Sequence, residues 1–200
     1  MKYTFKSKYF LTNYFNNLIK VAQNIDINKI NNITEVLISS INKNKNIFVA
    51  GNGGSASIAN HLLCDFNKGI KISSKKKLKP KVISLANSIE IMTAISNDIA
   101  YEKVFCSQIE NYCNKGDILI CFSSSGQSKN IINVINFAKK KTIKTILFQG
   151  FGNLNKKIKP DYYINLKYKN YGITEDIFQS IMHAISQNIR SKFQPKDLIL

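Results

Sequence analysis

The sequence predicts an α/β fold in which helices cover both faces of a parallel sheet. Short β-prone apolar runs alternate with segments whose apolar residues recur at helical spacing. The clearest run is DILICF at residues 117–122, which is typical of a strand buried on both faces. Two runs lead directly into unusual loops, at residues 51–55 and 123–128. In parallel sheets, ligands bind at the carboxyl ends of the strands, where both loops would lie.

The elements are expected in the following order. Residues 1–43 form an N-terminal helical arm, with apolar residues such as Ile30, Ile33 and Leu37 at helical spacing, and the arm packs on the domain or in an oligomer. Residues 44–200 form the single α/β domain. Its strands are expected at 47–50, 82–86, 117–122, 142–149 and, at an edge after Pro160, 162–166. Its helices are expected at 55–66 with a Ser55 cap, from 88 to an interruption at 97–98, and at 101–112, 129–140 and 174–190.

The composition favours a cytoplasmic globular protein. With 44% hydrophobic residues among 200, the chain can bury a core. No apolar run approaches the roughly 18 residues that span a bilayer, and the N-terminus does not lead into a signal-peptide core. The four cysteines form no C-x-x-C pair, so we expect reduced thiols and neither a zinc knuckle nor a thioredoxin-like site.

The formal net charge of +17 points to an anionic partner. The densest basic run is KKKLKPK at residues 75–81, and no aromatic residue interleaves with it as a stacking platform for nucleic acid would require. We therefore expect a solvated basic loop there, with no nucleic-acid or membrane partner.

The loop at residues 51–55, GNGGS, follows the first strand of the domain. Glycines at this place let the backbone approach a ligand closely and direct a helix N-terminus toward it. The segment is neither a Walker motif nor G-x-G-x-x-G. An ordinary tight turn is the alternative interpretation.

The loop at residues 123–128, SSSGQS, supplies hydroxyl and amide groups at the start of the next helix. Such groups form a neutral cradle for a phosphate dianion, assisted by the helix dipole. A loop that merely caps the helix is the alternative. Together with the glycine turn, the loop predicts binding of a phosphorylated sugar.

The two histidines of the chain each share a helix face with a carboxylate. His61 and Asp65 are four residues apart, whereas Glu175 and His183 are eight apart and roughly two turns distant. A histidine and a carboxylate from each of two helices would suit a divalent transition metal, most commonly zinc. Two partly buried, hydrogen-bonded histidines are the alternative.

Three segments carry a family resemblance: GNGGSA at 51–56, ISNDIAYEKVF at 95–105 and SSSGQS at 123–128. They resemble the sugar isomerase (SIS) domain and, within it, the sedoheptulose 7-phosphate (phosphoheptose) isomerases, over nearly the whole chain. The resemblance implies a flavodoxin-like three-layer sandwich around a five-stranded parallel sheet. It also implies a homotetramer with active sites between subunits, conversion of sedoheptulose 7-phosphate to D-glycero-D-manno-heptose 7-phosphate, no redox cofactor and, in some members, zinc.

The resemblance also assigns site residues. The substrate-binding candidates are Asn52, Gly53, Ser55, Asn97, Asp98, Ser123, Ser124, Ser125 and Ser128. The metal candidates are His61, Asp65, Glu175 and His183. Asp65 would move a proton between C1 and C2 through an enediol, with His183 serving the oxygens; if Asp65 binds the metal tightly, Glu175 becomes the better base. The chain departs from the family pattern, which has Glu at 65 and Gln at 175, and the shorter Asp65 would draw the base back by about 1.5 Å.

Three other functions share this sequence pattern. A non-catalytic SIS protein that binds a replication initiator would be expected to lose the histidines. A sugar-phosphate-sensing regulator would need a helix-turn-helix domain, for which 43 residues are too few. An isomerase of another ketose phosphate, such as a hexulose or arabinose phosphate, shares the chemistry and stays open.

Overall fold

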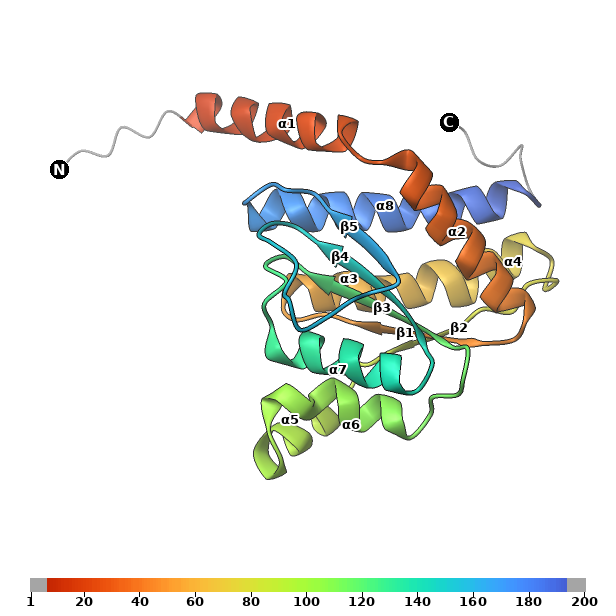
Figure 1. Ribbon diagram of the computed structural model, residues 1–200. Coiled ribbons are helices and arrows are strands. Elements are labelled where there is room, and N and C mark those ends of the chain that lie inside the picture. Colours follow the sequence, from red (N-terminus) through yellow and green to blue (C-terminus); the bar gives the residue numbers. More distant parts are fainter. Residues whose placement is uncertain (1–6, 194–200) are drawn as a thin grey trace.

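In the computed structural model, which describes residues 7–193, the strands form one parallel sheet in the order β2–β1–β3–β4–β5 (Figure 1). The strands are β1 (Asn46–Ala50), β2 (Lys81–Ser84), β3 (Ile118–Ser123), β4 (Lys144–Gln149) and β5 (Tyr162–Asn165). This order is that of flavodoxin-like sheets, and β5 lies at an edge as the sequence predicts. The predictions for residues 1–6 and 194–200 lie outside the described part of the chain.

The sheet has an apolar core on each face because its central strands alternate their side chains. On β3, Ile118, Ile120 and Phe122 enter one core, whereas Leu119 and Cys121 enter the other. All five side chains are fully buried, which explains why this strand reads as a continuous apolar run.

On the first face lie α1 (Ser7–Gln23), α2 (Ile27–Asn42), α3 (Gly54–Leu63) and α8 (Tyr171–Ser191) (Figure 1). The side chain of Phe178 on α8 packs on the sheet, with its ring centroid 5.9 Å from that of Phe122 and 6.0 Å from that of Phe148. These aromatic contacts fix α8 against β3 and β4, so the helix that carries His183 has a defined position over the sheet.

The second face is covered by α5 (Ile89–Asp98), η2 (Tyr101–Lys103), α6 (Val104–Glu110) and α7 (Lys129–Lys140) (Figure 1). The bounds of α7 agree with the prediction, and its apolar residues line the core beside Leu119 and Leu147. The predicted helix at 101–112 is instead a short 3₁₀ turn followed by the shorter α6.

The helix after β1 differs from the prediction at both ends. Its N-cap is Gly53, at φ 55°, and the side chain of Ser55 makes no capping bond. Beyond Leu63 the chain continues as the π-helical η1 (Cys64–Ile70) and then α4 (Lys71–Ser73), and the side chains of Phe66 and Ile70 are both buried. Asp65 therefore lies in a π-helical turn, a distortion frequent at functional sites.

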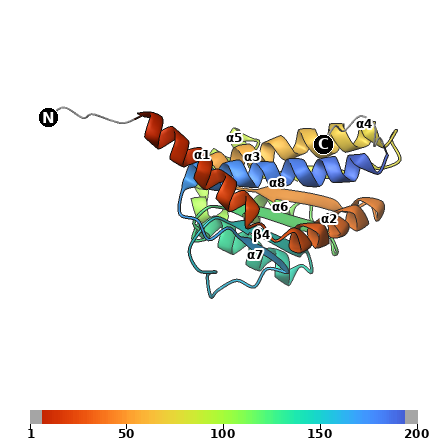
Figure 2. The ribbon, with the colours of Figure 1, turned by 90° about the horizontal axis from the view of Figure 1, so that it is seen from above.

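The predicted N-terminal arm consists of two helices, with α1 lying obliquely over α8 (Figure 2). The hydroxyl of Tyr14 donates a 2.6 Å hydrogen bond to Oδ2 of Asp176, and this bond raises the pKa of Tyr14 to about 12. No helix within residues 7–193 is long and apolar enough to cross a membrane.

Candidate active site

A pocket of about 130 Å³ opens at the carboxyl ends of β1 and β3, where the sequence predicts a phosphate cradle. Its lining consists of Asn52, Ser55, Phe122, Ser123, Ser124, Ser125, Ser128, Tyr171 and Glu175. Both predicted loops therefore meet in one pocket. Tyr171, which starts α8, lies at this pocket and packs edge-on against Phe151, with ring centroids 5.2 Å apart.

The conformation of the serine loop is fixed in part by hydrogen bonds within the loop. The Oγ of Ser123 accepts the N–H of Gly126 at 3.1 Å, and the Oγ of Ser125 accepts that of Gln127 at 3.3 Å. The Oγ of Ser124 is buried, yet it has no hydrogen-bond partner within residues 7–193. A buried hydroxyl without a partner is costly, so its position in this pocket indicates a site for a polar ligand.

Glu175 lies against the first residue of α3. The carboxylate of Glu175 packs directly on Gly54, in space that a Cβ at this position would otherwise take. Burial, and then the nearby charge of Asp176, raise the pKa of Glu175 above its ordinary value. The side chain of Glu175 thus lines the same pocket as the serines.

His61, Asp65 and His183 come together between α3–η1 and α8, and each offers one ligand atom within 4.8 Å of the others. The two Nε2 atoms are 3.0 Å apart, and each lies 3.6 Å from an oxygen of Asp65. The Oδ2 atom of Asp65 is buried without a hydrogen-bond partner in the described part of the chain. Two imidazoles and an unsatisfied carboxylate oxygen are a donor set that fits a divalent transition metal.

Glu175, the fourth predicted metal candidate, is not brought into this triad, since it lies in the serine pocket. Gln179, which the sequence analysis missed, lies there instead, with its Nε2 2.8 Å from Nε2 of His183. The signal was present in the spacing, because Gln179 precedes His183 by one helical turn of four residues.

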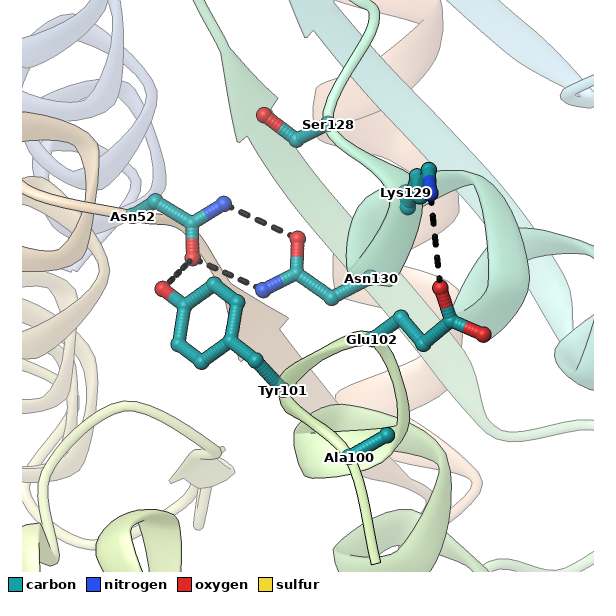
Figure 3. Close-up of a pocket in the computed structure, with 7 residues that line it drawn as sticks. All are labelled: Asn52, Ala100, Tyr101, Glu102, Ser128, Lys129 and Asn130. Carbon is teal, nitrogen blue, oxygen red and sulfur yellow. Dashed lines mark hydrogen bonds and ion pairs between the residues drawn. The ribbon is translucent and has the colours of Figure 1, made fainter. Parts of the chain in front are cut away.

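The predicted substrate residues Asn97 and Asp98 are exposed at the end of α5, where the amide of Asn97 donates to Asp98 at 2.8 Å. Neither lines the serine pocket. The segment immediately after them approaches the site, because Tyr101 contacts Asn52 (Figure 3). Gly53 flanks this contact as the N-cap of α3, at a positive φ that favours glycine.

Comparison with known proteins agrees with this geometry. Residues 11–150 match the SIS domain, which defines the class. A probable phosphoheptose isomerase of Thermoplasma acidophilum is 33% identical over 170 residues, covering 85% of this chain and 92% of the relative. The chain therefore belongs to the phosphoheptose isomerase family of SIS domain proteins.

Two further comparisons define the extent of the similarity. The phosphoheptose isomerase of Thermodesulfovibrio yellowstonii is 35% identical over 125 residues, which cover 62% of this chain and 60% of that protein. The solved structure of phosphoheptose isomerase GmhA from Neisseria gonorrhoeae superposes with a TM-score of 0.79 at 22% identity, covering 93% of this chain and 100% of that chain. This likeness confirms the fold.

Proposed function

We propose that this chain is an aldose–ketose isomerase that converts sedoheptulose 7-phosphate to D-glycero-D-manno-heptose 7-phosphate. The observation that carries the proposal is that the serine pocket and the histidine triad lie along the same two helices. On α3–η1, Ser55 lies at the pocket and His61 in the triad; on α8, Glu175 lies at the pocket and His183 in the triad. A substrate lying between these helices reaches both.

The spacing of the two sites supports a long sugar phosphate. Ser55 and His61 are six residues apart and Glu175 and His183 eight, which corresponds to about 9 and 12 Å along a helix axis. An extended heptulose 7-phosphate measures about 9 Å from phosphorus to C2, at roughly 1.25 Å per bond, whereas a tetrulose 4-phosphate measures about 5 Å. A seven-carbon chain therefore spans the shorter of the two distances, and the names of the curated relatives also favour seven.

The acid–base chemistry needs only side chains of this chain. A carboxylate removes a proton from C1 while an acid supplies a proton to the C2 oxygen, which gives an enediol. The enediol then loses the proton on its C1 oxygen and gains one at C2, leaving an aldehyde at C1. We assign the C1–C2 proton transfer to Asp65 and the proton transfers at the oxygens to His183; when Asp65 binds a metal tightly, Glu175 is the better base.

We also propose that His61, Asp65 and His183 hold zinc, which when bound would polarise the substrate carbonyl. The unsatisfied Oδ2 of Asp65 and the 3.0 Å approach of the two Nε2 atoms support this assignment. Gln179 lies beside the same nitrogen of His183, so its side chain would turn away from Nε2 when that nitrogen binds the metal.

We further propose a homotetramer with active sites at subunit interfaces. Side chains of His61 and His183 are 48% and 43% exposed in the single chain, so the site is open on one side. Large apolar side chains are exposed along α1: Tyr9, Phe10, Leu11, Phe15 and Ile19.

The absence of disulfides among the four cysteines, all of which are described, supports a reducing compartment and thus the cytoplasm.

The test is conversion of sedoheptulose 7-phosphate by the purified chain, followed by NMR with zinc and with a chelator. We expect turnover with zinc, and a loss of at least about 100-fold in His183→Ala, the size of a general acid–base contribution. Glu110→Gln, an exposed change on α6, is the control. Absence of turnover and of bound metal would exclude the isomerase, whereas turnover confined to a hexulose or arabinose phosphate would overturn the heptose assignment.

Oligomeric state has its own test. A mass near 22.7 kDa in light scattering would contradict the tetramer and the shared active sites. A mass about four times larger is expected.

A further inference from the structure

Asn52, on the turn after β1, forms a reciprocal amide pair with Asn130 in the first turn of α7 (Figure 3). Nδ2 of Asn52 donates to Oδ1 of Asn130 at 2.9 Å, and Nδ2 of Asn130 donates to Oδ1 of Asn52 at 2.9 Å. The hydroxyl of Tyr101 donates a third bond to Oδ1 of Asn52, at 2.8 Å. Three elements that are distant in the sequence therefore meet at one side-chain amide.

A backbone group determines the orientation of both amides. The N–H of Ile131 donates to Oδ1 of Asn130 at 2.9 Å, and a backbone N–H can only donate. The oxygen of Asn130 must therefore face Ile131, which leaves its NH₂ group facing Asn52. Asn52 must in turn present its oxygen to that NH₂ group and to Tyr101, because reversing the amide would set donor against donor.

This orientation leaves Asn52 with one kind of group for a ligand. Within residues 7–193, its oxygen accepts two hydrogen bonds, whereas its Nδ2 donates only one and so uses one of its two N–H groups. Asn52 lines the serine pocket and also an adjoining pocket of about 470 Å³, to which Ser128 is common. The remaining N–H is thus available to an acceptor, such as a phosphate or hydroxyl oxygen of the sugar phosphate.

The position of Tyr101 is itself held by α7. The carboxylate of Glu102 lies 3.8 Å from Nζ of Lys129, and the backbone carbonyl of Glu102 accepts the amide of Asn133 at 3.1 Å. Asn130 is 2% exposed, so its hydrogen bonds are shielded from water. The contact with Asn52 therefore belongs to an anchored arrangement of η2 against α7.

We propose that Asn130 and Tyr101 are positioning residues that fix the Asn52 amide with its N–H toward the bound sugar phosphate. This inference rests on the proposed function, since it names residues that act through a substrate-binding side chain. The inference gives Tyr101, in the ISNDIAYEKVF segment of residues 95–105, a role in substrate binding. Asn97 and Asp98 of the same segment do not line the serine pocket in this structure.

The experiment compares two variants by calorimetric titration with sedoheptulose 7-phosphate. Tyr101→Phe removes one donor to Asn52 without adding charge. Asn130→Asp keeps an acceptor for the N–H of Ile131 but sets an oxygen against Oδ1 of Asn52, so the pair no longer fixes the orientation of the Asn52 amide. Asn136→Asp, on the same helix and without a side-chain hydrogen bond in the described structure, controls for the added charge.

We expect the dissociation constant to rise about threefold in Tyr101→Phe, the size of one lost hydrogen bond, and about tenfold in Asn130→Asp, where a hydrogen bond is replaced by a contact between two acceptors. Asn136→Asp should bind as the parent does, and all variants should unfold within a few degrees of it. KM should rise by the same factors with kcat changed less than about twofold.

The outcomes separate the inference from the function on which it rests. Unchanged affinity in both Tyr101→Phe and Asn130→Asp would overturn the inference. A loss confined to Asn130→Asp would be an effect of charge and would overturn it as well. If Asn130→Asp does not fold, Tyr101→Phe decides alone. If the parent protein binds no sedoheptulose 7-phosphate, the proposed function fails instead.

Discussion

Asp65 offers the sharpest test of the histidine triad, because its replacement should stabilise the metal-free protein and weaken the metal-bound one. Without a metal, Oδ2 of Asp65 is buried with no hydrogen-bond partner in residues 7–193, which costs about 1–3 kcal/mol. In Asp65→Asn, the amide can donate to an imidazole nitrogen. We expect the free energy of unfolding in chelator to rise by about 1 kcal/mol, the lower end of that range.

Zinc should reverse this order. A ligand at about 100 times its dissociation constant stabilises the folded state by about 2.7 kcal/mol. For a domain of this length, about 1 kcal/mol moves the unfolding midpoint by 2–4 °C, so the parent should gain about 5–11 °C. Asp65→Asn lacks the charged ligand and should gain less than half of that shift at the same zinc concentration.

Thermal unfolding followed by circular dichroism, in chelator and in zinc, measures both predicted effects of Asp65→Asn. Glu110→Gln removes an exposed carboxylate far from the triad and should follow the parent in each condition. Equal zinc shifts in the parent and in Asp65→Asn, or no shift in the parent, would refute the assignment of the triad as a metal site. A less stable Asp65→Asn in chelator would refute the argument from the unsatisfied oxygen.

Three further predictions follow from single contacts. Gly51→Ala should destabilise the fold by about 1–3 kcal/mol in urea unfolding, because its Cβ would lie 2.4 Å from the backbone oxygen of Ser55, and an unchanged midpoint would contradict this. Glu175→Gln should bind inorganic phosphate about three- to tenfold more tightly in calorimetry, since the change removes a like charge from the serine pocket; weaker binding would show that Glu175 does not face the anion. Tyr14→Phe should lower stability by about 0.5–1.5 kcal/mol at pH 8. The folded state keeps the Tyr14 proton longer than the unfolded chain, whose pKa is near 10, so this difference should be full below pH 10 and be lost as the pH rises toward 12; a difference that does not change with pH would contradict the hydrogen bond to Asp176.

The site shows what spacing along a helix can and cannot predict. His61 and Asp65 share a face of one helix, and this local fact was visible in the sequence. The sequence did not show whether Glu175 or Gln179 would be the neighbour of His183. Both lie on the same face of α8, and only the distance of α3–η1 along that face decides which one reaches the triad.

The helix boundaries likewise depend partly on the local sequence and partly on tertiary packing. The cap at Asn170, whose side chain accepts the N–H of Ile173, starts α8 three residues before the predicted start at 174. After β1, the helical segment continues well past its predicted end through a π-helical turn, in which Phe66 and Ile70 are buried in the core. Burial is a property of the assembled core, so periodicity alone places such ends poorly.

The sequence by itself determined the parallel α/β fold, the two loops at strand ends and the pairing of His61 with Asp65, because these depend on local periodicity and residue chemistry. Only the tertiary structure decided that Glu175 lies with the serines rather than with the metal candidates, and that Tyr101 and Asn130 hold Asn52. The physical reason is that hydrogen-bond polarity and ligand geometry depend on the packing of elements that are distant in the chain, from the 49 residues between Asn52 and Tyr101 to the 122 between His61 and His183.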